Sequence, residues 1–285
     1  MIRLNQVKKN YQGFHLNVSM SIPSGSIIGL IGQNGAGKST TFKILMDLIN
    51  KDEGTIALFG KELVHLTKTD KEKIGVVLSD SGFSNYLTIS DVIPIISILY
   101  ANFDRQYFDS LISKFHLPTD KRIKDFSTGM KVKLKVIIAI SHHPLLLILD
   151  EPTAGLDVVA RDEVLDLLRD FMIGNEERSI LISSHISSDL ESLCDEIYMI
   201  DNGKIIFHEE TDRILSDYAL LKVDTETIKE DNLDPSYLLI KKNMNSITTY
   251  LTNQKQFYRE NYPTIVVEDI GIDEVMTLII KGERL

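Results

Sequence analysis

The sequence has little cysteine and no long hydrophobic run. Cys194 is the single cysteine in 285 residues, so the chain can form no internal disulfide, and we expect a reducing compartment. No run of about eighteen apolar residues occurs, so no transmembrane helix is predicted. The most apolar region, 136–149, is interrupted by polar residues and is typical of a helix end followed by a buried strand. Residues 1–6 are too polar for a signal peptide, so a role at a membrane would need a separate partner.

Basic residues are outnumbered by acidic ones. The chain has 31 Lys and Arg against 41 Asp and Glu, which gives a net charge of −10 and an isoelectric point near 5.2. Nucleic-acid binding needs a basic surface that displaces counterions from phosphates, so we expect no nucleic-acid partner. With 43% hydrophobic and 25% charged residues, the composition is that of a globular protein with an ordinary core.

Short apolar runs alternate with helix-like segments up to about residue 215. This alternation predicts an α/β fold with a doubly wound, largely parallel sheet. The predicted strands are 2–7, 25–31, 55–59, 74–78, 145–149, 179–183 and 196–200, and the predicted helices are 40–48, 161–172 and 188–194, with a helical stretch at 85–116. Residues 216–285 contain short β-like runs and a final helix-like segment, which predict a separate small α+β domain.

A glycine-rich loop follows the second predicted strand. Its sequence, GQNGAGKST, matches the pattern G-x-x-x-x-G-K-[ST] between a strand and a helix. Glycines let backbone N–H groups approach phosphate oxygens, and the N-terminus of the following helix adds partial positive charge. Lys38 can reach the outer phosphates of a nucleotide, and the Ser39 hydroxyl is placed to bind Mg²⁺. The predicted nucleotide-binding residues are Gly32, Gln33, Asn34, Gly35, Ala36, Gly37, Lys38, Ser39 and Thr40.

Two carboxylates end the most apolar predicted strand. In the sequence LLLILDEP, Asp150 and Glu151 follow the run 145–149 directly. A parallel strand at the centre of a sheet delivers its last residues to the edge where ligands bind. Asp150 can then hold Mg²⁺ through water, and Glu151 can polarise a water molecule aimed at the γ-phosphate. The pair predicts hydrolysis of the bound nucleotide.

Three further motifs surround the acidic pair in a fixed order. FSTGM, residues 126–130, precedes Asp150, AGLD at 154–157 follows Glu151, and SSH ends at His185. In this order and spacing, residues 1–215 resemble the nucleotide-binding domain of ATP-binding cassette (ABC) proteins. The resemblance implies a P-loop NTPase core with a mostly parallel sheet, an antiparallel β-subdomain and a helical subdomain at about 85–130, with 216–285 as a C-terminal appendage.

The resemblance also implies a role for each motif residue. Tyr11 corresponds to the aromatic residue that stacks on adenine, and Asp157 to the aspartate that couples two sites. His185 corresponds to the switch histidine that contacts the γ-phosphate, and it joins Lys38 and Glu151 as a catalytic residue. The family's signature loop binds the γ-phosphate of a nucleotide held by a second subunit, and here it contains Ser127, Thr128 and Gly129. We therefore expect two chains, identical or paralogous, to enclose two ATP molecules with Mg²⁺ in a head-to-tail dimer.

The chain departs from the usual family pattern at two places. The common signature is LSGGQ, but here Thr128 replaces a glycine and Met130 replaces the glutamine. The family also has a magnesium-binding glutamine after the strand that corresponds to 74–78. At that place this chain has Ser79 and Asp80. Either Ser79, acting through water because its side chain is shorter, or Asp80 could supply the metal ligand.

These departures resemble a bacterial subgroup of ATPases that energise small exporters, including those of bacitracin-type resistance and phenol-soluble-modulin export. The resemblance implies a peripheral ATPase on the cytoplasmic side of the membrane, docked on a separate transmembrane permease through residues 80–125. The alternatives are a soluble mechanical ATPase acting on ribosomes or DNA, and a nucleotide sensor with little turnover. A single cassette, the absence of sustained heptads and the acidic charge disfavour the first alternative, and intact Lys38, Glu151 and His185 disfavour the second.

Overall fold

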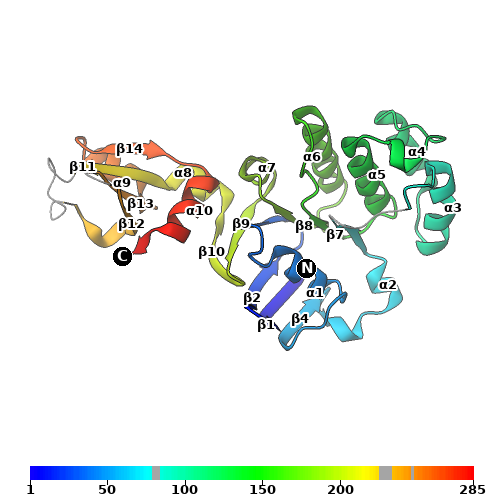
Figure 1. Cartoon of the computed structure of the whole chain (residues 1–285), viewed down its shortest axis with the longest axis horizontal. Coiled ribbons are helices and arrows are strands. Elements are labelled where there is room, and N and C mark those ends of the chain that lie inside the picture. The colour runs from blue at the N-terminus through cyan, green and yellow to red at the C-terminus, as the bar shows by residue number, and fades with distance from the viewer. Residues whose placement is uncertain (79–83, 225–232, 245–246) are drawn as a thin grey trace.

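The computed structural model describes residues 1–78, 84–224, 233–244 and 247–285. These residues form two lobes, each built on its own sheet (Figure 1). The larger lobe contains a ten-stranded sheet and the smaller one a five-stranded sheet. The second sheet begins at residue 219, close to the boundary that the sequence predicts at 215/216.

The larger sheet is mixed, and its strands follow the order β5-β4-β1-β2-β10-β9-β3-β8-β7-β6. Strands β9, β3, β8, β7 and β6 are parallel, whereas β5, β4, β1 and β2 pair in antiparallel fashion. The strands are β1 (Ile2–Tyr11), β2 (Phe14–Ile22), β3 (Ile27–Ile31), β4 (Glu53–Leu58), β5 (Lys61–Glu62), β6 (Ile74–Val77), β7 (Leu146–Asp150), β8 (Ser179–Ser184), β9 (Glu196–Asp201) and β10 (Lys204–Glu210). This arrangement confirms the predicted α/β class, with β2, β5 and β10 as strands that the sequence analysis did not predict.

The parallel strands are apolar throughout because both faces of the sheet are covered. Along β7, Leu147 and Leu149 pack into one hydrophobic cluster, and Leu146 and Ile148 pack into the other. One cluster contains helices α5 (Thr128–Ile140) and α6 (Val158–Ile173), and the other contains α1 (Lys38–Leu45) and the antiparallel strands. Such two-sided burial explains why these strands appear in the sequence as continuous apolar runs. It also fixes the carboxyl ends of β3, β7 and β8 at one edge of the sheet.

The helices of the larger lobe fall into two groups. Helices α1 (Lys38–Leu45), α2 (Lys68–Lys71), α6 (Val158–Ile173), α7 (Ser187–Leu193) and α8 (Thr211–Asp217) lie close to the sheet, and α3 (Ile89–Leu99), α4 (Arg105–Lys114) and α5 (Thr128–Ile140) gather at one end of the molecule (Figure 1). Helix α5 packs against both α4 and α6. The second group occupies the region predicted to form a helical subdomain.

The smaller lobe is an antiparallel sheet with a helix on each face. Its strand order is β14-β11-β13-β12-β15, and α10 packs with residues of the large core cluster, whereas Tyr258 of α9 lies in a separate cluster. Its elements are β11 (Ala219–Asp224), β12 (Leu238–Met244), β13 (Ile247–Thr252), α9 (Lys255–Asn261), β14 (Val266–Asp269), α10 (Ile272–Lys281) and β15 (Glu283–Arg284). Helix α10 lies on the side of this sheet that faces the larger lobe (Figure 1).

Candidate nucleotide-binding site

The glycine-rich loop connects β3 to α1 at the carboxyl edge of the parallel strands. Gly35 and Gly37 have φ angles of 83° and 116°, in the left-handed region that favours glycine. A β-carbon on Gly32 would lie 2.3 Å from the carbonyl oxygen of Ile200. The loop can therefore curl tightly in front of the sheet and present its backbone N–H groups at the N-terminus of α1.

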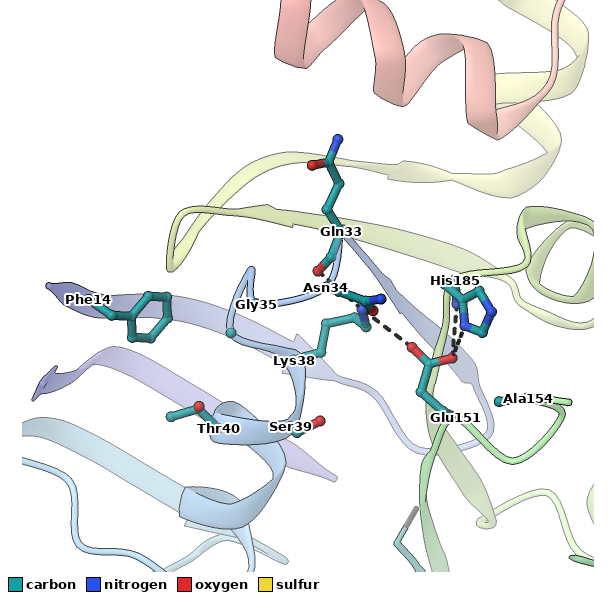
Figure 2. A pocket seen from close by; sticks show the side chains of 11 residues that line it. Phe14, Gln33, Asn34, Gly35, Lys38, Ser39, Thr40, Glu151, Ala154 and His185 are labelled. Carbon is teal, nitrogen blue, oxygen red and sulfur yellow. Dashed lines mark hydrogen bonds and ion pairs between the residues drawn. The ribbon is translucent and has the colours of Figure 1, made fainter. Parts of the chain in front are cut away.

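A cavity of about 430 Å³ lies against this loop (Figure 2). It joins residues that belong to separate motifs in the sequence, because the loop, Glu151 of the acidic pair and His185 all line it. The lining residues are Phe14, Gln33, Asn34, Gly35, Gly37, Lys38, Ser39, Thr40, Glu151, Ala154 and His185. The concave shape, the loop amides and one buried ammonium group suit a phosphorylated ligand.

Three charged or ionisable side chains form a chain of contacts across the cavity (Figure 2). The Lys38 ammonium donates to the Gly32 carbonyl at 2.6 Å and lies 3.3 Å from Glu151 Oε1. Glu151 Oε2 lies 2.5 Å from Nδ1 of His185 and accepts the His185 backbone N–H at 3.1 Å. Lys38 is only 6% exposed, so its ammonium group is held in a fixed position inside the cavity. Phosphate oxygens of a bound nucleotide would replace Glu151 as its partner there.

Ser183 positions both acidic residues, and the sequence analysis missed it. Its hydroxyl donates to Asp150 Oδ1 at 2.6 Å and accepts the Glu151 backbone N–H at 3.0 Å. Glu151 has a φ of 52°, which non-glycine residues rarely adopt, so its backbone needs such support. Ser183 follows an apolar run in β8. A polar residue near the end of such a strand was the sequence feature that could have indicated a role in the site.

Replacing Ser183 by alanine should lower ATP turnover by about tenfold, the loss expected for a hydrogen bond to a charged group. Asp150 loses the Ser183 hydroxyl as a donor, so the Mg²⁺ concentration needed for half-maximal activity should rise, whereas ATP affinity measured without Mg²⁺ should not change. A Mg²⁺ titration of ATPase activity checks this result. Ser183→Thr should restore part of the activity, and Ser179→Ala, which removes another fully buried hydroxyl of β8, serves as the control. Equal losses in the two alanine variants would indicate a purely structural effect.

Two residues of the site could bind a magnesium ion, one through a hydroxyl group and the other through a carboxylate. Ser39 lines the cavity, and Asp150 is 1% exposed at the end of β7. Mg²⁺ prefers oxygen ligands and retains several waters and phosphate oxygens, so two protein ligands are a suitable number. Within the described ranges no group of three or more His, Cys, Asp or Glu could hold a metal by itself. Ser79 and Asp80 lie outside the described residues, so their predicted metal role stays a prediction.

The signature residues lie in a different place from the phosphate loop. Ser127, Thr128, Gly129 and Asp157 line a second cavity of about 570 Å³, which shares no lining residue with the first. Ser127 caps α5 by accepting the Met130 N–H at 3.2 Å. Asp157 caps α6 in the same way. The structure thus brings these predicted residues together with one another, but not with the phosphate loop of the same chain.

Gly129 is held against the neighbouring helix. A β-carbon on Gly129 would lie 2.9 Å from Cβ of Ala160, so the two helices could not approach as closely with a larger residue there. A partly buried ion pair between Lys133 and Glu163, at 2.8 Å, joins the same two helices. The Ser and Gly that remain from the family signature therefore have structural support, even though Thr128 and Met130 differ from the usual pattern.

The aromatic residue at the cavity is Phe14, not the predicted Tyr11. Phe14 lines the cavity, and a β-carbon on Gly37 would lie 3.1 Å from its Cζ. Tyr11 is absent from the lining and 44% exposed, with its ring centre 6.5 Å from that of Phe14. Both residues flank the turn between β1 and β2. The stacking role of Tyr11 stays a prediction, and the geometry makes Phe14 the nearer candidate.

We expect Phe14→Ala to weaken ATP binding by about tenfold, within the range measured for loss of one aromatic–base stack. Tyr11→Ala should have a smaller effect because its side chain lies outside the cavity. Titration with a fluorescent ATP analogue compares the two variants directly, and Tyr86→Ala, at a 72% exposed aromatic elsewhere, is the control. If Tyr11→Ala costs the greater affinity, the resemblance locates the adenine better than the cavity does.

Comparison with known proteins agrees with this geometry. The sequence profile described as "ABC transporter" matches residues 16–154. The chain is 30% identical to ABC transporter ATP-binding protein YtrB of Bacillus subtilis over all of this chain and 99% of YtrB. It is 38% identical to lantibiotic transport ATP-binding protein SrtF of Streptococcus pyogenes, over 74% of this chain and 92% of SrtF. With bacitracin transport ATP-binding protein BcrA of Enterococcus faecalis it shares 34% identity over 66% of this chain and 62% of BcrA.

The fold also matches a solved cassette. A dimeric post-hydrolysis structure of the ATP-binding cassette MJ0796 with ADP and Pi superposes with a TM-score of 0.65, at 20% identity, over 74% of this chain and 99% of that chain. At this identity the likeness establishes the fold. Together with the profile match, it confirms the predicted fold of a P-loop NTPase of the ABC ATPase type.

The fold and the site define a nucleotide-hydrolysing P-loop protein. More particularly, the chain belongs to the ATP-binding proteins of ABC transporters. It is an ATPase, and the predicted likeness to bacitracin-type ATPases is confirmed by the match to BcrA. The described residues include no helix that is long and apolar enough to cross a membrane.

Proposed function

We propose that this ATPase powers a separate transmembrane permease that exports peptides or antimicrobial compounds, and that it works on the cytoplasmic face of the membrane. Two cassettes would close head to tail around two ATP molecules. The observation that carries this proposal is the separation of the phosphate-loop cavity from the signature cavity within one chain. Each cavity is half of a composite site, so a second chain would complete both.

Within the site, each residue has a distinct task. Lys38 neutralises phosphate oxygens, and the loop amides orient them. Glu151 accepts a proton from the attacking water, and His185, which already contacts Glu151 Oε2, keeps that carboxylate aimed at the cavity. Ser39 and Asp150 would hold Mg²⁺, which would supply charge neutralisation during phosphoryl transfer. Ser127 and Gly129 would contact the γ-phosphate bound by the partner cassette.

A docking surface for the permease is proposed on α3. Its buried side contains Val92 and Ile96, yet Ile95, Ile98 and Leu99 of the same helix are 38%, 83% and 56% exposed. A surface helix normally presents polar residues to water, so three exposed large aliphatic side chains on one helix favour burial by a partner. Helix α3 lies at the far end of the helical group, away from the C-terminal lobe (Figure 1).

The export substrate is inferred from relatives. SrtF and BcrA are described as lantibiotic and bacitracin transport proteins, and both substrates are antimicrobial. YtrB, which matches along the whole chain, is described only as an ABC transporter ATP-binding protein. We therefore assign the class of cargo, peptides or antimicrobial compounds, and no individual molecule.

An affinity purification of tagged Glu151→Gln from detergent-solubilised cells, with ATP and Mg²⁺, tests the permease. Mass spectrometry should find a polytopic membrane protein in stoichiometric amount. Ile98→Asp should lose this partner, whereas Ile173→Asp on α6, at an equally exposed residue, should keep it (83% and 84% exposed). Recovery of ribosomal or DNA-repair proteins without a membrane protein would contradict the transporter role and favour the soluble mechanical ATPase.

A further inference from the structure

The C-terminal lobe contains a cavity of about 320 Å³ between its sheet and α10. This volume is at the small end of the range of ligand pockets, roughly 300–1,000 Å³. Its walls combine two Leu residues with hydroxyl groups and with charges of both signs. The lining residues are Leu220, Lys222, Lys242, Thr249, Asp273, Glu274, Thr277 and Leu278. None of them belongs to the ATP site.

The floor of the cavity is one row across three strands. Thr249 of β13 pairs with Lys222 of β11 on one side and with Lys242 of β12 on the other. Residues that pair directly across neighbouring strands point to the same face of a sheet. Two residues further along, the corresponding row around Leu251 is apolar and packs beneath α10. The row of two lysines and one threonine therefore lies at the border of the packed apolar core.

The roof comes from the first two turns of α10, which carry Asp273, Glu274 and Thr277. Some of the charges are already engaged. Lys222 pairs with Glu268 at 2.7 Å, and Glu274 Oε2 accepts the Gly271 N–H at 3.0 Å.

Lys242 on the floor and Asp273 on the roof, by contrast, have no ion-pair partner among residues 1–78, 84–224, 233–244 and 247–285. The hydroxyl of Thr249, a residue only 9% exposed, has no hydrogen-bond partner within the same ranges. An ammonium, a carboxylate and a hydroxyl thus line one small cavity, and none of them has a partner in the part of the chain that the structure describes.

We propose that this cavity binds a small zwitterion, namely a free amino acid with an apolar side chain. Its carboxylate would pair with the Lys242 ammonium and accept from the Thr249 hydroxyl. Its ammonium would pair with Asp273, and its side chain would lie against Leu220 and Leu278. Binding should require both charged groups of the ligand. A ligand without its carboxylate would leave Lys242 unpaired, and a ligand without its ammonium would leave Asp273 unpaired.

The cavity is joined to the ATP site through α7. Glu191 Oε1 accepts the Ile272 N–H at the start of α10 at 2.8 Å. A β-carbon on Gly271 would lie 2.9 Å from the same oxygen, so a side chain at this position would displace the Glu191 carboxylate. The N-terminal turn that roofs the ligand cavity is therefore bonded to the ATPase lobe.

Helix α7 is also bonded close to the catalytic residues. Its buried Asp189 accepts the Thr153 hydroxyl at 2.5 Å and pairs with Arg161 of α6. Thr153 lies two residues after Glu151, and α7 starts two residues after His185. A ligand that holds the first turn of α10 in place would thus restrict the motion of α7, which follows His185 in the chain and is hydrogen-bonded to Thr153 close to Glu151. The cavity would then act as a regulatory site for the ATPase.

Calorimetric titration of the full chain with free leucine, isoleucine, valine, methionine and phenylalanine tests the binding site. At least one should bind, and its amide, which lacks the carboxylate, and its deaminated acid should each bind about tenfold more weakly or worse. Lys242→Met and Asp273→Asn should each cause a similar loss, and Lys281→Met, at the exposed end of α10, should not. Absence of binding by every amino acid, or binding unchanged in Lys242→Met, would overturn the proposal.

A second measurement tests the connection. ATP affinity with and without the bound amino acid should differ, and the amino acid's affinity should change by the same factor when ATP is present. Glu191→Ala should retain amino-acid binding but lose this linkage. Linkage that persists in Glu191→Ala would reject the route through α7. Both readouts are independent of any permease, so they can fail while the proposed transport function stands, and the reverse also holds.

Discussion

Glu151→Gln should abolish ATP turnover while leaving ATP binding intact. The amide cannot accept a proton from water at neutral pH, so the loss should reach about a hundredfold or more, the usual contribution of a general base. The geometry adds a second expectation. Glu151 holds the Lys38 ammonium at 3.3 Å, so removal of its negative charge frees that ammonium for phosphate. ATP affinity should therefore be equal to or higher than that of the unmodified chain.

The variant should also accumulate as a dimer when ATP and Mg²⁺ are present, because closure is no longer followed by hydrolysis. Size-exclusion chromatography with light scattering measures this, and phosphate release measures turnover. Glu176→Gln, at an exposed residue in a surface loop, is the matched control and should hydrolyse ATP normally without accumulating as a dimer. Continued hydrolysis by Glu151→Gln would exclude Glu151 as the base, and a monomer with bound ATP would count against the composite site.

The strongest features of the fold and the site could be predicted because they depend on local sequence. The run before Asp150 is apolar at every position since both faces of β7 are covered. The glycines of the loop stand where φ is positive or where the backbone passes close to another strand. Each of these requirements acts within a few residues, so the pattern along the chain records it.

Other features depend on contacts between distant segments. Ser183 and Asp150 are 33 residues apart, and the hydrogen bond between them exists only because β7 and β8 pair in one register. Phe14 lines the cavity because the turn after Tyr11 folds it over the loop, whereas both residues have the same aromatic character in the sequence. The bond from Glu191 to Ile272 joins two lobes across 81 residues. No local period or motif marks any of these three contacts.

Lys38→Met should lose ATP affinity by about ten- to a hundredfold, which corresponds to roughly 1.5–3 kcal/mol for a hydrogen bond to a charged group. Methionine keeps the apolar stem in a site where Lys38 is 6% exposed, so the fold should be retained. Turnover should fall further than affinity, because the same ammonium also neutralises charge that develops during phosphoryl transfer.

The loss of ATP affinity should come from the position of Lys38 in the site and not from the removal of one positive charge from the protein. Lys121→Met removes a positive charge from an exposed residue of the helical group and should leave ATP affinity unchanged. In Lys38→Met the Glu151 carboxylate keeps its contact with His185, so the thermal midpoint without nucleotide should change little, whereas the ATP-dependent rise of that midpoint should disappear. A variant that still gains thermal stability from ATP would mean that the loop amides alone bind the phosphates, with Lys38 confined to the chemical step.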